Sequence, residues 1–137
     1  MNHKLNWANG SIYINGEGVG NYKKESSGNL SVQFKEIELL FRNSTNSDGG
    51  IEMFCPKNGK LGKIKRGRFK SPSKIILTDG REYSLEPKGV FSKKWKLKAN
   101  DNTLVVFSKS LTDKGEAIYI FEDELLILSG MVGIGVQ

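Results

Sequence analysis

Five dipeptides in which Asn or Asp precedes Gly divide the first part of the chain into short segments, and this spacing constrains the fold most strongly. They are Asn9-Gly10, Asn15-Gly16, Asp48-Gly49, Asn58-Gly59 and Asp79-Gly80. Both residue types of such a dipeptide tolerate the positive φ angles of a type I′ turn. Each dipeptide therefore predicts a tight β-hairpin turn.

The segments around these turns are rich in β-branched and aromatic residues, which is typical of short strands. The expected strands are Ser11–Ile14, Leu30–Phe34, Ile37–Phe41, Ile51–Cys55, Leu61–Ile64, Lys74–Thr78, Arg81–Leu85, Lys94–Lys98, Thr103–Ser108 and Ala117–Phe121. The clearest hairpin joins Lys74–Thr78 to Arg81–Leu85 through a two-residue turn. No internal stretch shows a clean 3.6-residue period, which argues against alternating strands and helices. The sequence predicts an all-β protein, an antiparallel sandwich or barrel.

The C-terminal segment Leu125–Val136 departs from this pattern, because it is apolar almost throughout. A strand with one solvated face alternates, whereas a segment that is apolar on every side needs burial all round. The preceding acids, Glu122–Glu124, suit the positive end of a helix dipole. Gly130, Gly133 and Gly135 each disfavour a helix by roughly 1 kcal/mol, but they let neighbours approach closely. We predict a helix that fills the inside of a closed sheet; a central sandwich strand is the alternative.

The hairpin Lys74–Leu85, the strands within Lys94–Phe107 and the tail Glu122–Gln137 together resemble the tubby C-terminal-like superfamily. That superfamily includes tubby domains, LURP-one-related proteins and phospholipid scramblases. The resemblance implies a β-barrel of about twelve strands wound around a hydrophobic C-terminal helix. It also implies phospholipid headgroups as a partner. The chain is shorter than a typical member, and no family binding motif aligns with it residue by residue, so no functional residue transfers.

Length and composition limit the class of protein. A chain of 137 residues that is 37% hydrophobic suits one domain, residues 1–137, built around the core segment 124–136. A single cysteine, Cys55, excludes an internal disulfide, and a single histidine, His3, leaves little for metal or acid–base chemistry. We therefore expect a protein that is not an enzyme and needs no cofactor or metal.

Targeting signals are also missing from the sequence. Residues 1–14 contain no apolar run of signal-peptide length. Spanning a bilayer takes about 20 apolar residues, and the C-terminal apolar segment is shorter than that. We expect a cytoplasmic protein without an integral membrane span.

Positive charge is concentrated in the middle of the chain. The net charge is +6, but Lys57–Lys98 holds 14 Lys and Arg against three acids, so this segment has +11 and the remainder −5. Such a distribution predicts one strongly positive face. The candidate anion-binding residues are Lys63, Lys65, Arg66, Arg68, Lys70, Lys94, Lys96 and Lys98.

Alternation in Lys94–Lys98 places its lysines on one face of a strand and Trp95 and Leu97 on the other. The successive ammonium groups, roughly 7 Å apart, suit a row of phosphates. One interpretation is a solvated strand face that blocks edge-to-edge aggregation. The other is a binding surface, for which the resemblance points to an anionic membrane surface. Single-stranded nucleic acid is the alternative partner, but it usually needs exposed aromatic rings, and Trp95 is expected to point inward.

Overall fold

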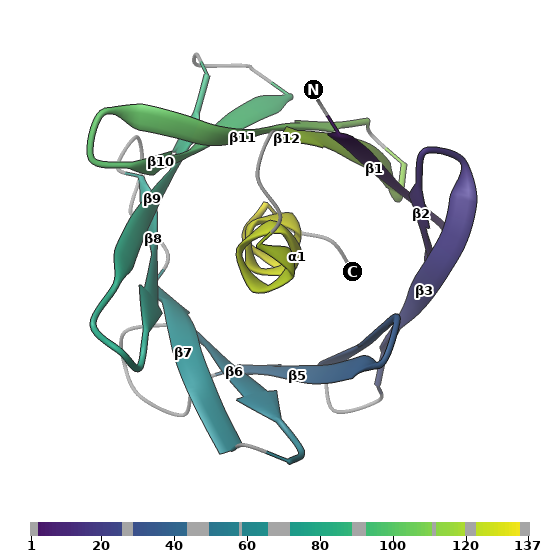
Figure 1. Ribbon diagram of the computed structural model, residues 1–137, viewed down its shortest axis with the longest axis horizontal. Helices are drawn as coiled ribbons and strands as arrows, with labels where there is room; N and C mark the ends of the chain where they lie inside the picture. The colour runs from purple at the N-terminus through teal and green to yellow at the C-terminus, as the bar shows by residue number, and fades with distance from the viewer. Residues whose placement is uncertain are drawn as a thin grey trace.

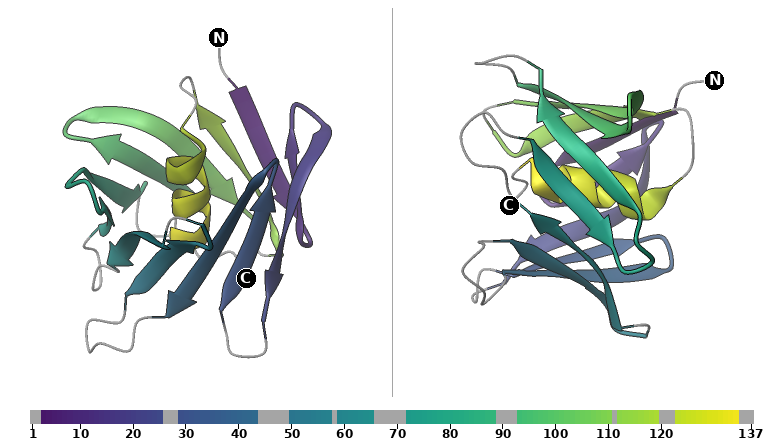
Figure 2. Two further views of the ribbon diagram at one scale, coloured as in Figure 1. Left: turned by 60° about the horizontal axis from the view of Figure 1, so that its bottom comes forward. Right: turned by 90° about the vertical axis from the view of Figure 1, so that its left-hand side faces the viewer.

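The protein is a closed antiparallel barrel with a helix inside it. The computed structural model describes residues 3–25, 29–43, 50–57, 59–65, 72–88, 93–110, 112–119 and 123–134. The strands are β1 (His3–Ala8), β2 (Ser11–Ile14), β3 (Glu17–Lys24), β4 (Leu30–Phe34), β5 (Ile37–Asn43), β6 (Ile51–Cys55), β7 (Gly59–Lys65), β8 (Ser73–Leu77), β9 (Glu82–Pro87), β10 (Lys94–Ala99), β11 (Asn102–Lys109) and β12 (Lys114–Tyr119). Each pairs with its neighbours in the chain, and β12 pairs with β1 to close the sheet. The helix α1 (Glu124–Gly133) runs through the lumen (Figures 1 and 2).

This architecture confirms the predicted fold class, including the helical state of the C-terminal segment. Strands β2, β4 and β6 have the expected bounds. Strands β1 and β3 were not predicted, and His3 lies in β1, where its ring stacks on Tyr119 at 5.5 Å. Strand β12 ends at Tyr119, whereas the predicted end, Phe121, lies outside the described residues.

Two of the predicted turns have the expected backbone conformation. Asn9 and Gly10 have φ angles of 49° and 91°, and Asn15 and Gly16 have 50° and 86°. Positive φ at both central residues is the mark of a type I′ turn. Asp48, Gly49 and Asn58 lie outside the described residues.

The turn between β8 and β9 corrects a prediction. The prediction of a two-residue turn at Asp79-Gly80 is wrong. Leu77 N–H donates to Arg81 O (2.9 Å), and Gly80 N–H donates to Leu77 O (3.0 Å). The loop therefore has three residues, and within it Gly80 has the positive φ. The Asp79 side chain accepts from the backbone N–H of Arg81 at 3.0 Å and from its guanidinium at 2.8 Å. These bonds hold the pKa of the Asp79 carboxyl below its ordinary value.

The helix α1 is buried on nearly all sides by the barrel wall. Every residue from Leu126 to Val132 is buried, including Ser129, whose hydroxyl donates to Leu125 O at 2.6 Å. A Cβ atom at Gly130 would overlap the Phe107 ring of β11, and one at Gly133 would lie 2.8 Å from Leu85 Cδ2 of β9. These two glycines, which cost helix propensity, therefore let the wall approach the helix closely.

Polar contacts hold the first turn of α1 at one end of the barrel. The Asp123 carboxylate caps the helix by accepting from Leu126 N–H at 3.3 Å. Lys35, in the β4–β5 turn, forms an ion pair with Glu124 at 2.8 Å. Arg81 lies 3.9 Å from Asp123. Asp123 and Glu124 thus lie at the N-terminus of the helix, as the sequence predicted. Glu122 lies outside the described residues.

A buried tyrosine fastens the wall near the other end of the helix. Tyr22 of β3 donates its hydroxyl proton to Asp113 at 2.7 Å, and its backbone N–H donates to Gly10 O at 2.8 Å. Burial and the nearby Asp113 carboxylate raise the pKa of Tyr22 well above its ordinary value. At neutral pH the phenol is a neutral donor, and this hydrogen bond ties β3 to the β11–β12 turn.

The described part of the chain has no helix with the length and apolar character needed to cross a membrane.

Substituting Gly130 tests the close packing of α1. Gly130→Ala is expected to lower the free energy of unfolding by about 2 kcal/mol, because the overlap with Phe107 outweighs the gain in helix propensity. Chemical denaturation measures this. The loss is expected to shrink in a Phe107→Leu background. Gly18→Ala, where the nearest atom is a Tyr13 ring carbon at 3.9 Å, is the control and is expected to change stability little.

Deleting residues 124–137 tests whether the helix is the core of the barrel. The truncated chain is expected to lose its cooperative thermal transition, because the inward side chains of the wall would face an empty lumen. Circular dichroism during heating measures the transition. A soluble truncated protein that melts cooperatively would show that the wall is stable alone.

Candidate functional site

The predicted anion-binding lysines that the structure describes all lie on the outer face of the barrel wall. Lys63 and Lys65 are exposed on β7, on either side of the buried Ile64. On β10, Leu97 is fully buried and Trp95 packs against the core, so Lys94, Lys96 and Lys98 point outward. The predicted alternation in Lys94–Lys98 is confirmed. Arg66, Arg68 and Lys70 lie outside the described residues.

The register of the sheet aligns lysines from three strands. Lys65 of β7 is directly opposite Lys74 of β8, Lys74 is opposite Ser84 of β9, and Ser84 is opposite Lys98 of β10. We call Lys65, Lys74 and Lys98 the lysine row. Directly opposite residues have Cβ atoms about 4.5–5.5 Å apart, so like charges there repel. Within the described part of the chain, Lys65 and Lys74 form no ion pair, so their charges face solvent.

Acids on the same face lie beside three of the predicted lysines, one of them in this row. Glu86 of β9 lies 3.4 Å from Lys98 and directly opposite Lys96. Lys63 is opposite Glu52 of β6. The structure therefore brings Lys65 and Lys98 together with Lys74, while acidic neighbours flank Lys63, Lys96 and also Lys98. Sequence reasoning did not single out Lys74, because its position beside Lys65 depends on how β7 and β8 are paired.

A second outward row alternates charge with apolar surface. Lys96 of β10 is opposite Val106 of β11, Val106 is opposite Ile118 of β12, and Ile118 is opposite Lys4 of β1. Ile118 is 39% exposed, which is high for an isoleucine, and Lys4 is ion-paired with Glu116 at 3.0 Å. This apolar strip lies next to the cationic strands.

The cysteine and the histidine of the chain lie on different strands. No three His, Cys, Asp or Glu side chains in the described ranges converge as a metal site would require. Cys55, at the end of β6, is a free thiol. His3 of β1 stacks on Tyr119, and strand β1 lies across α1 from strand β6 (Figure 1). The two residues therefore do not form a thiol–imidazole pair.

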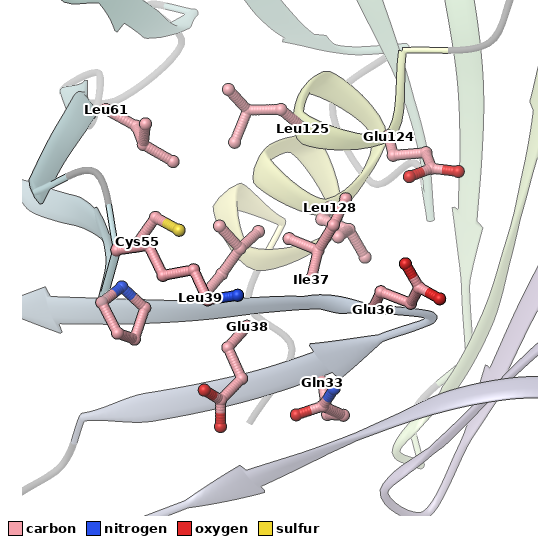
Figure 3. A pocket seen from close by; sticks show the side chains of 12 residues that line it. Gln33, Glu36, Ile37, Glu38, Leu39, Cys55, Leu61, Glu124, Leu125 and Leu128 are labelled. Carbon is pink, nitrogen blue, oxygen red and sulfur yellow. The ribbon is translucent and has the colours of Figure 1, made fainter.

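A pocket of about 630 Å³ opens at the end of the barrel where α1 begins (Figure 3). Its walls are the β4–β5 hairpin, the turn after β6, and the first two turns of the helix. Leu39, Leu125 and Leu128 give it an apolar floor, and Glu36 and Glu38 line its opening. Sequence analysis missed this site, because its residues meet only when the barrel closes around the helix.

Comparison of the chain with family models, with curated proteins and with solved structures gave no match.

Charge reversal at Lys74 tests the repulsion within the lysine row. Lys74→Glu is expected to raise the free energy of unfolding by roughly 0.5 kcal/mol at low salt, because it replaces a like-charged pair with an opposite-charged one. The gain is expected to shrink at high salt, where exposed charges are screened. Urea denaturation at both ionic strengths measures it. Lys114→Glu, opposite Ala8, is the matched control. If Lys114→Glu raises the free energy of unfolding equally, or Lys74→Glu does not raise it at low salt, the lysines of the row do not repel each other as proposed.

Proposed function

We propose that this protein is a non-enzymatic binding module whose outer face on β7 to β10 binds an anionic partner through phosphate groups, as on a phospholipid surface. The observation that supports the proposal best is the register that aligns Lys65, Lys74 and Lys98. Lys65 and Lys74 are exposed and lie directly opposite each other. Folding therefore holds two like charges side by side at a cost that a bound phosphate would relieve.

The chemistry of the row suits phosphate oxygens. Each ammonium has three donors and can be shared among several oxygens. Ser84, between Lys74 and Lys98, adds a hydroxyl that can donate to the same group. A lysine near an anionic membrane contributes about 1 kcal/mol of binding free energy. The row is thus strong enough for reversible attachment, and too weak for permanent anchoring.

Two features favour a lipid surface over single-stranded nucleic acid. The neighbouring row places Val106 and the exposed Ile118 between Lys96 and Lys4, and apolar side chains among lysines suit the boundary between headgroups and acyl chains. Trp95 packs inward, so it is not available for base stacking. The resemblance of the chain to tubby-like domains and phospholipid scramblases points to the same class of partner.

Vesicle capture tests the proposal. The protein is expected to co-float with phosphatidylcholine vesicles that contain phosphatidylserine, to remain unbound without phosphatidylserine, and to dissociate as salt rises. Lys65→Gln, Lys74→Gln and Lys98→Gln combined are expected to weaken capture about thirtyfold at low salt, about 1 kcal/mol each for Lys65 and Lys74 and little more for Lys98, which is paired with Glu86. Conversely, Glu86→Gln is expected to strengthen it several-fold, because it frees Lys98 and removes an acid opposite Lys96.

A second triple variant is the matched control. Lys23→Gln, Lys24→Gln and Lys114→Gln remove the same charge from β3 and β12. If the control triple weakens capture equally, binding depends on net charge and the assignment of the face is wrong. If the protein instead binds oligothymidylate more tightly than vesicles, with tryptophan quenching, the nucleic-acid alternative replaces the lipid proposal.

A further inference from the structure

The barrel wall is open between the ends of two neighbouring strands, β5 and β6. Their ladder runs from Leu40, paired with Phe54, to Asn43, paired with Ile51. The first part of β5, Ile37–Leu39, is paired on its other side with β4. The register thus leaves this part of β5 without a partner on β6, and the chain turns away at Pro56, which has no N–H to donate.

The pocket described above lies at this opening and extends inward to the helix (Figure 3). Its inner surface is apolar and comes from three elements, with Leu39 on β5, Leu61 on β7, and Leu125 and Leu128 on α1. Ile37 lies at the entrance and is 37% exposed, so apolar surface continues outward. A volume of about 630 Å³ lies within the range of pockets that hold small organic ligands.

The entrance of the pocket is acidic. Glu36, Glu38 and Glu124 line it, together with Lys57. Glu124 is neutralised by its ion pair with Lys35 at 2.8 Å. Glu36 and Glu38, in contrast, form no ion pair with any other residue in the described ranges. With Lys57 offsetting one of them, the entrance retains a net negative charge.

We propose that this pocket binds a small cationic amphiphile, an aliphatic body with a protonated amine at one end. The aliphatic body lies against Leu61, Leu125 and Leu128, where burial of each CH₂ group contributes about 0.8 kcal/mol. The ammonium lies at the entrance, in the field of Glu36 and Glu38, whose carboxylates accept hydrogen bonds from its donors. This function is separate from the lysine row, which lies on the outside of the wall and has the opposite charge.

The site contains its own reporter. Cys55 lines the pocket, and it is the single cysteine of the chain, so alkylation of the full-length protein modifies one known position. A ligand in the pocket covers this thiol and slows its reaction with N-ethylmaleimide. Intact-mass spectrometry then measures occupancy without any assumption about activity.

Three probes of equal chain length separate the contributions of the aliphatic body and the charge. Decylammonium and decanoate, each below its micellar concentration, and decanol, below its solubility limit, are titrated at neutral pH against the rate of Cys55 alkylation. Decylammonium is expected to protect at the lowest concentration, decanol at a higher one, and decanoate least. Equal protection by all three, stronger protection by decanoate, or no saturable protection by decylammonium would overturn the proposal.

Charge-neutral variants test the entrance. Glu36→Gln combined with Glu38→Gln is expected to weaken decylammonium about tenfold and to leave decanol unchanged, because each partly exposed charge pair contributes modestly. Glu17→Gln combined with Glu82→Gln removes the same charge from exposed residues outside the pocket lining. If this control weakens decylammonium equally, or the first pair leaves it unchanged, the carboxylates do not hold the amine.

A filling variant tests the apolar end. Leu61→Trp is expected to abolish protection by decylammonium and by decanol, because the indole occupies the space of the aliphatic body. Its thermal transition is measured in parallel. If this variant does not fold, Leu125→Phe, which also fills the pocket from α1, replaces it. If a folded filling variant still shows full protection of Cys55 from alkylation, the probe binds outside this pocket and the proposal is overturned.

Discussion

The contact between α1 and the wall of the barrel is the constraint on which the structure depends. A barrel of about eight strands is just wide enough for its inward side chains to fill. This barrel has twelve, so its wall cannot bury its apolar face without an additional element. The C-terminal segment supplies that element, because it is apolar on every side and has Gly130 where Phe107 crosses it. The capping carboxylate of Asp123 and the ion pair of Glu124 with Lys35 fix where the helix begins.

A straight helix inside a twisted wall does not contact every strand equally well. Its glycines face Phe107 of β11 and Leu85 of β9, so the wall approaches closely on that side. Next to β5 and β7 the space beside Leu125 is open, and it becomes the pocket. The same packing that completes the core therefore also creates a lined cavity, and the entrance lies where β5 and β6 stop pairing.

The two proposed surfaces lie on different strands of the barrel. The apolar part of the pocket is built by inward residues such as Leu39 and its entrance includes the exposed Glu38 of the same strand, whereas the lysine row is built by outward residues of β7, β8 and β10. Negative charge gathers at the end of the barrel around Glu36 and Glu38, and positive charge lies on the wall around Lys65 and Lys74. The barrel thus carries two surfaces of opposite charge around one core.

Local signals predicted most of the strands, and their failures have physical reasons. Strand β3 contains Gly18 and Gly20, which are unfavourable in strands, but a side chain at Gly20 would overlap the Gln33 carbonyl of β4. The need for glycine at position 20 therefore follows from the pairing of β3 with β4. Strand β1 has no Asx-Gly turn before it to mark its start, although Leu5 and Trp7 alternate inward as in any strand. The Asp79-Gly80 dipeptide predicted that a turn occurs there but not how many residues it has. The length of the loop depends on the hydrogen bonds of Arg81 with Leu77 and Asp79.

The sequence by itself determined the all-β class, the need of the apolar C-terminal segment for burial on every side, and two tight turns, at Asn9-Gly10 and Asn15-Gly16, while the structure decided that the segment is a helix. These follow from short-range chemistry, namely the positive φ that Asn-Gly allows and the apolar character of Leu125–Val136. Within one strand it also determined which way Lys94, Trp95 and Lys96 point. The tertiary structure decided which strands' lysines meet, since Lys65 and Lys74 are neighbours only through the register of β7 and β8. It also decided that a pocket exists, because Leu39, Leu61 and Leu125 lie far apart in the chain and meet only when the sheet closes around the helix.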